Sequence, residues 1–218
     1  MELTLVQQLS VAVLPILLAV TVHEAAHGLI ADKLGDHTAR AAGRVTLNPI
    51  KHIDPIGTII LPLAMYALSG FMFGWAKPVP VNWRNLSNPR RDTALVAAAG
   101  PAANFIMLLG WTLILVLATN FAQTSSWVSV PLIHMARFGM LINAVLMALN
   151  LLPLLPLDGG RILNSFLPAR AAIGFSKLEP YGFFILIGLL VSGLLAKVLM
   201  PAVQGLINFS VTLMSIFH

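Results

Sequence analysis

Two histidines and a glutamate form the pattern HEAAH at residues 23–27. His23 and His27 are four residues apart, so on a helix they lie on the same face. Two imidazoles at this spacing can bind one zinc ion, and Glu24 between them can take a proton from a water molecule on that metal. The alternative is a pair of packed histidines in a helix core. Because the pattern ends a long apolar stretch, where ionisable side chains are costly and usually functional, it favours a zinc site.

A catalytic zinc ion usually has three protein ligands and one open position. The chain has no cysteine, so the third ligand must be a histidine or a carboxylate. Asp158 is the best candidate, because it follows a proline-broken stretch and precedes two glycines, which allow the backbone to approach a ligand closely. Asp158 is an equally good N-cap for a helix beginning at Arg161, so the local sequence leaves both roles open.

Four other ionisable residues lie in polar loops. Glu179 and Asp54 are weaker candidates for the third ligand, because each stands among polar residues. His37 and His52 have no ligand spacing to the HEAAH pattern, and we interpret both as ordinary loop residues.

The composition predicts an all-α polytopic membrane protein with four to six membrane segments. The chain has 218 residues, of which 58% are hydrophobic and 10% charged, and its mean hydropathy is +0.87. We expect a single membrane-embedded domain over 1–218, with a catalytic core at about 5–165 and C-terminal helices at about 180–217. In such a protein the net charge of +5 reports topology, so no nucleic-acid partner is predicted.

The apolar stretches predict where the membrane segments lie. The first, at about 5–34, carries HEAAH near its exit, and we expect it to be a retained helix because no cleavage site follows. Asp92 is a plausible N-cap for the next long helix. The remaining stretches are 56–74, 92–118, 132–152, 181–197 and 202–217, and whether the last crosses the membrane is left open.

Two short strands are also predicted, at Arg44–Leu47 and at Val79–Trp83. Pro80 would confine the second strand to a sheet edge. A transmembrane helix hides its peptide bonds, so a substrate helix must be opened before cleavage. An opened substrate could then pair with these strands by adding an edge.

The zinc hypothesis constrains the topology. Asp158 reaches the histidines only if two helices, not three, cross between them. The stretch at 56–74 is interrupted by a proline and a Ser-Gly pair, so we predict that it is re-entrant and lies near the cytoplasmic face. All 13 basic residues except Arg137 and Lys197 then lie on the zinc side, which the positive-inside rule makes cytoplasmic.

Three blocks together resemble the site-2 protease family of intramembrane zinc metalloproteases: HEAAH at 23–27, AAGPAANF at 98–105 and NLLPLLPLDGGR at 150–161. The run FGWAKPVPVN at 73–82 resembles the compact prokaryotic branch of that family. The resemblance implies a multi-pass plasma-membrane enzyme that cleaves single-pass transmembrane proteins, with membrane lipid around it.

The resemblance also implies roles for individual residues. His23, His27 and Asp158 would bind one Zn²⁺, and Glu24 would be the general acid and base. Asn150 would hold the substrate or stabilise the oxyanion. No oligomeric state is predicted.

Two further asparagines, Asn104 and Asn143, lie within the predicted helices. We interpret them as interhelical contacts, the alternative being that one of them supports Asn150 at the oxyanion. The competing function is a non-enzymatic metal-binding membrane protein, either a transporter or a scaffold. A non-enzymatic metal-binding protein would give Glu24 no catalytic role. Transporters also usually carry charged residues at mid-membrane on several helices.

Overall fold

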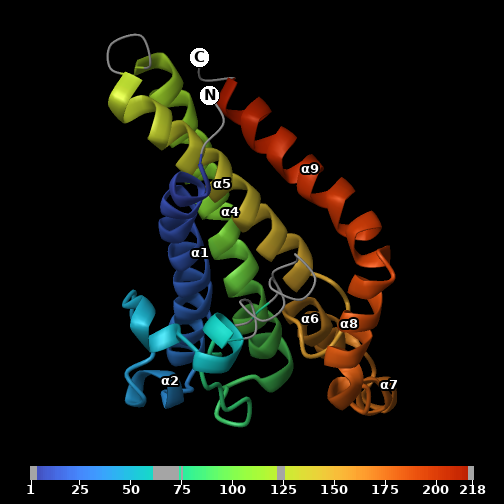
Figure 1. Ribbon diagram of the computed structural model, residues 1–218. Coiled ribbons are helices and arrows are strands. Elements are labelled where there is room, and N and C mark those ends of the chain that lie inside the picture. The colour runs from blue at the N-terminus through green and yellow to red at the C-terminus, as the bar shows by residue number, and fades with distance from the viewer. Residues whose placement is uncertain (1–3, 61–73, 75, 122–125, 216–218) are drawn as a thin grey trace.

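The computed structural model describes residues 4–60, 74, 76–121 and 126–215, and its regular structure in these ranges is helical, with no strand. Three long helices, α1 (Leu5–Lys33), α4 (Pro89–Phe121) and α5 (Ser126–Asn150), pack against one another. Figure 1 shows them side by side, with α9 (Leu194–Ser215) running along α5. The shorter elements are α2 (Thr38–Ala41), a 3-10 turn (Pro49–His52), a π-helical turn (Pro55–Ile60), α6 (Asp158–Phe166), α7 (Ala169–Ser176), a 3-10 turn (Glu179–Tyr181) and α8 (Gly182–Val191).

Five helical stretches are long and apolar enough to cross a membrane, judged by length and composition. They are Val6–Lys33, Pro89–Phe121, Trp127–Asn150, Ala169–Val191 and Leu194–Ser215. Most of their surface faces away from the protein, as expected for helices surrounded by lipid. The prediction of a multi-pass helical membrane protein is confirmed.

Two predicted helix boundaries were wrong. The helix expected to begin at Asp92 begins at Pro89, a residue well suited to a first helical position, and Asp92 instead accepts the backbone N–H of Asn88. The last two spans, predicted at 181–197 and 202–217, divide at Gly193, whose φ of 72° follows the end of α8, and not between residues 197 and 202. Pro201 lies inside α9.

Both predicted strands are also wrong. Residues 45–47 form bends, and residues 79–83 form no ladder. Pro78 and Pro80 have no N–H to donate, and the N–H of Val79 is bonded to a side chain. Without strands, the predicted addition of substrate to their edges loses its structural basis.

The bundle is held together by small residues facing large ones. At Gly139 of α5 an added Cβ would collide with the Trp111 ring of α4, so glycine is needed for the two helices to approach. Thr112 of α4 donates to Ser210 of α9 over 3.0 Å and links these helices inside the apolar core. The buried core residues here are Leu108, Trp111, Ala136, Met140, Ala144, Ala148 and Val203.

The helix directions bring the two halves of the predicted site together. Figure 1 shows α1 ending and α4 beginning at the same end of the bundle. Between His27 and Asp158 only α4 and α5 run the length of the bundle among the described residues. The predicted re-entrant stretch begins in the π-helical turn, but most of it lies outside the described residues, so its path stays a prediction.

Candidate metal centre

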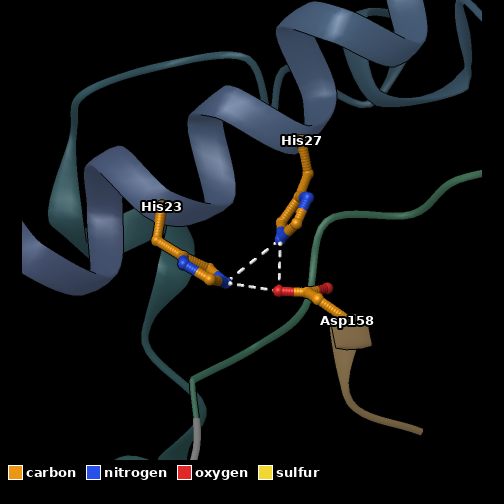
Figure 2. A group of neighbouring side chains, drawn as sticks. All are labelled: His23, His27 and Asp158. Carbon is orange, nitrogen blue, oxygen red and sulfur yellow. Dashed lines mark hydrogen bonds and ion pairs between the residues drawn. The ribbon is translucent and has the colours of Figure 1, made fainter. Parts of the chain in front are cut away.

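His23, His27 and Asp158 converge on one point. The two Nε2 atoms lie 3.0 Å apart, and Oδ2 of Asp158 lies 3.3 Å from Nε2 of His23 and 3.4 Å from Nε2 of His27. Figure 2 shows the two imidazoles pointing from α1 toward the carboxylate at the start of α6. A set of two nitrogen donors and one carboxylate oxygen is typical of a catalytic zinc site.

Asp158 is the first residue of α6, and the backbone cap of that helix is Leu157. Its competing role as the N-cap of a helix beginning at Arg161 is therefore wrong. Two glycines follow it, and a Cβ at either would collide with backbone: Gly159 with Leu151, and Gly160 with Leu154. The double glycine thus lets the chain fold back tightly after α5 and deliver the carboxylate to the histidines.

The outer nitrogens of both histidines are held by acceptors on α4. Nδ1 of His23 lies 2.6 Å from Oδ1 of Asn104, and Nδ1 of His27 lies 2.7 Å from the carbonyl of Val96. Because a carbonyl oxygen only accepts, each Nδ1 carries the hydrogen, and each Nε2 keeps a lone pair for a metal. The tautomers needed for zinc binding are therefore fixed by α4.

Asn104 is also an interhelical contact, as interpreted from the sequence. Its Nδ2 donates to the carbonyl of Ala19 on α1 and to Oδ1 of Asn143 on α5. Asn143 in turn donates to the carbonyl of Gly139 within α5. The bond between Asn104 and His23 was not predicted, although an amide at the same depth as the histidines is a signal for it.

The space between the ligands fits a metal ion. A Cβ at Gly100 would collide with the rings of both His23 and His27, so α4 passes the ligands only because this residue has no side chain. Oδ2 of Asp158 is buried and receives no hydrogen bond from the described residues. A bound cation would satisfy this buried carboxylate oxygen, which has no donor and faces two imidazole lone pairs.

Glu24 is half-buried on α1 beside the ligands. Its Oε2 accepts the backbone N–H of Val79 over 2.7 Å. Residue type gives no hint of this contact, because the donor is a backbone amide.

Asn150 ends α5, and its Nδ2 donates to the carbonyl of Leu146 one turn earlier. Among the described residues, the Asn150 side chain forms no hydrogen bond with His23, His27 or Asp158. A side-chain amide has two N–H groups, and this bond uses one of them.

The weaker candidates lie outside the ligand group. Glu179 pairs with Arg161 over 2.9 Å, and Asp54 accepts the N–H groups of Ile56 and Gly57. The exposed His37 pairs with the buried Asp32. His52 is buried and bonds to the carbonyl of Thr46, so it is a packed residue and not an ordinary loop residue.

Within the described residues, three ionisable side chains are grouped closely enough to hold a metal. A structural zinc site would use four protein ligands, so three ligands with a glutamate beside them indicate a metallohydrolase. Such a site in a bundle of apolar helices defines the class as a membrane metallohydrolase.

The family model described as Peptidase family M50 matches residues 11–193. The chain therefore belongs to this family, and it is a metalloprotease. This confirms the resemblance to the site-2 proteases.

Two curated proteins are similar over most of their length. The "Putative zinc metalloprotease YwhC" of Bacillus subtilis is 39% identical over 194 residues, which cover 88% of this chain and 85% of that protein. The "Putative zinc metalloprotease Rip2" of Mycolicibacterium smegmatis is 29% identical over 198 residues, covering 89% of this chain and 71% of that protein. No solved structure matches the chain significantly.

Proposed function

We propose that this protein is an intramembrane zinc protease that hydrolyses peptide bonds within or near the transmembrane segments of single-pass membrane proteins. The observation that carries the proposal is the convergence of His23, His27 and Asp158 at one end of a bundle of apolar helices. A soluble peptide would not require such a site to be built among lipid-facing helices.

The three converging side chains would hold one Zn²⁺. When bound, zinc lowers the pKa of a coordinated water to about 7 and polarises the scissile carbonyl. Asn104 and the carbonyl of Val96 keep the two imidazoles in the required tautomer and orientation.

Glu24 is the proposed general base and acid. Its carboxylate takes a proton from the attacking water and returns it to the nitrogen of the leaving amine. Oε2 is held by Val79, and no described residue donates to Oε1, which is therefore available to the water. Asn150 is proposed to donate its remaining N–H to the oxyanion or to the substrate backbone.

We further propose that the protein lies in the plasma membrane with the active site near the cytoplasmic side. The basic residues of the loops after α1 and α5 support this orientation through the positive-inside rule. A cysteine-accessibility scan in whole cells should protect a cysteine at Arg84 and label one at Trp127, which is exposed at the start of α5. The reverse result would contradict the orientation.

Cleavage of a co-expressed single-pass membrane protein, with zinc content measured in parallel, tests the function. Glu24→Gln should keep zinc and lose cleavage, because the amide accepts no proton from water. Asp158→Asn should weaken both zinc binding and cleavage. Unchanged cleavage by Glu24→Gln would refute the mechanism, and zinc binding without cleavage by the wild type would favour a non-enzymatic metal-binding protein.

A further inference from the structure

Arg44 is a buried cation outside the metal centre. Only 7% of its surface is exposed, and its Nε atom has no hydrogen-bond partner among the described residues. No carboxylate in the described part of the chain forms an ion pair with it. Burying an unpaired charge is expensive, so this position calls for an explanation.

The guanidinium holds the backbone of the 77–79 segment. Its Nη2 donates to the carbonyl of Lys77 over 2.7 Å and approaches the carbonyl of Pro78 at 3.4 Å. From the other side, the N–H of Lys77 donates to the carbonyl of His52 over 2.9 Å. Two successive peptide units are thus fixed immediately before Val79.

Val79 connects this fixed backbone to Glu24, the proposed base. Its N–H donates to Oε2 of Glu24 over 2.7 Å. Its side chain is buried against α1 one turn further on, where a Cβ at Gly28 would lie 3.1 Å from the side chains of both Val79 and Val45. The packing of the Val79 side chain and its backbone hydrogen bond together fix the position of this amide relative to α1.

We propose that Arg44 is a positioning residue for Glu24, acting through the backbone of Lys77, Pro78 and Val79. The inference rests on the proposed role of Glu24 as general base. By holding the two carbonyls, Arg44 fixes the amide that holds one carboxylate oxygen, and so sets where the other oxygen meets the water. A misplacement of about 1 Å in such a group costs up to about 100-fold in rate.

The test compares variants at position 44 in the purified zinc-loaded protein, with a single-pass membrane protein as substrate. Arg44→Met keeps the volume and removes every donor, so kcat should fall about 10- to 100-fold with KM within about twofold. Arg44→Lys keeps an ammonium donor and should recover part of the loss. Arg40→Met, at an exposed arginine paired with Asp32, makes the same chemical change nearby and should leave kcat unchanged.

A second variant removes the hydrogen bond at its other end. Val79→Pro deletes the N–H that reaches Glu24 and should reproduce the kcat loss of Arg44→Met, whereas Val79→Ala keeps the N–H and should lose less. Full zinc content is expected in every variant, because none touches a ligand. Unchanged kcat in Arg44→Met, or loss of zinc in parallel with kcat, would overturn the inference. Glu24→Gln separates the two proposals, since an inactive Glu24→Gln beside a fully active Arg44→Met would leave the proposed function standing.

Discussion

Nδ1 of His23 lies 2.6 Å from Oδ1 of Asn104, and both residues are buried where α1, α4 and α5 meet. The same amide donates to Asn143 on α5. The Asn104 side chain on α4 thus sets the tautomer of the metal ligand His23 on α1. It also links α5 to α1 and α4. The metal centre and the helix packing therefore depend on one another.

Replacing Asn104 by leucine should weaken zinc binding by about 10- to 100-fold. Leucine has a similar size but no acceptor, so Nδ1 of His23 loses the bond that fixes its tautomer and ring orientation. Competition with a zinc chelator in detergent solution measures the change in affinity.

The control for this variant is Thr112→Val on the same helix. It removes the buried hydrogen bond to Ser210, which links α4 to α9 away from the ligands. It should alter thermal stability and leave zinc affinity unchanged. Equal zinc affinity in Asn104→Leu and wild type would show that Asn104 has only a packing role.

A methyl group at Gly100 should abolish zinc binding and cleavage. Alanine there would collide with both ligand imidazoles, so the rings would have to move away from Asp158. Zinc content after purification, measured by atomic emission, checks the result. Gly110→Ala on the same helix meets nothing within 4 Å and should retain zinc, with a stability gain of about 0.5–1 kcal/mol. A zinc-loaded, active Gly100→Ala protein would contradict the close approach of α4.

The two histidine ligands could be predicted from residue type and spacing, because HEAAH places two imidazoles on one helix face. For Asp158 the local sequence left the roles of ligand and N-cap open, and the resemblance to the site-2 proteases favoured the ligand. The contacts that orient these groups carry no such signal. The carbonyl of Val96 and the N–H of Val79 are backbone atoms, which every residue type supplies.

The errors in the predicted fold have a common physical origin. The stretch at 79–83 has residues that suit a strand, yet the N–H groups of Val79 and Asn82 are bonded to the side chains of Glu24 and Asp36, so long-range contacts override the local preference. The predicted stretches 181–197 and 202–217 are separated at Pro201, but this proline lies inside α9, because a proline is tolerated inside an apolar helix that packs against its neighbours. Gly193, with its positive φ, ends the preceding helix instead.

Replacing Asn150 by leucine should lower kcat about 100- to 1000-fold with zinc content unchanged. The side chain donates one N–H to Leu146, and the proposed role assigns the other to the oxyanion, a contact of this size in other hydrolases. Steady-state cleavage of a single-pass substrate gives kcat and KM separately. Asn164→Leu on α6 serves as the control, because its exposed bond to Ser176 lies outside the ligand group. A normal kcat in Asn150→Leu would restrict this residue to its bond within α5.

Asp36 should make the loop after α1 sensitive to acid. Its carboxylate is fully buried and ties this loop to the segment before α4, accepting hydrogen bonds from Thr38, from the N–H of Asn82 over 2.7 Å and from Asn85 over 3.0 Å. Burial alone would raise the pKa of Asp36, but these hydrogen bonds outweigh it and hold the pKa below its usual range. The folded protein therefore binds this proton less readily than the unfolded chain, whose aspartate pKa is about 3.9.

The stabilisation from Asp36 is thus fully present above pH about 4 and is lost as the pH falls through the lower pKa of the folded state. Asp36→Asn should lower the free energy of unfolding at pH 7 by about 1.5–3 kcal/mol, because the charge-assisted hydrogen bonds are weakened. Its deficit relative to wild type should shrink on acidification, which thermal unfolding in detergent at a series of pH values measures. Asp54→Asn is the matched control, since that carboxylate accepts N–H groups only within its own turn and does not join two segments. A deficit in Asp36→Asn that stays constant from pH 7 to well below pH 4 would show that the charge of this carboxylate contributes nothing to the link between the two segments.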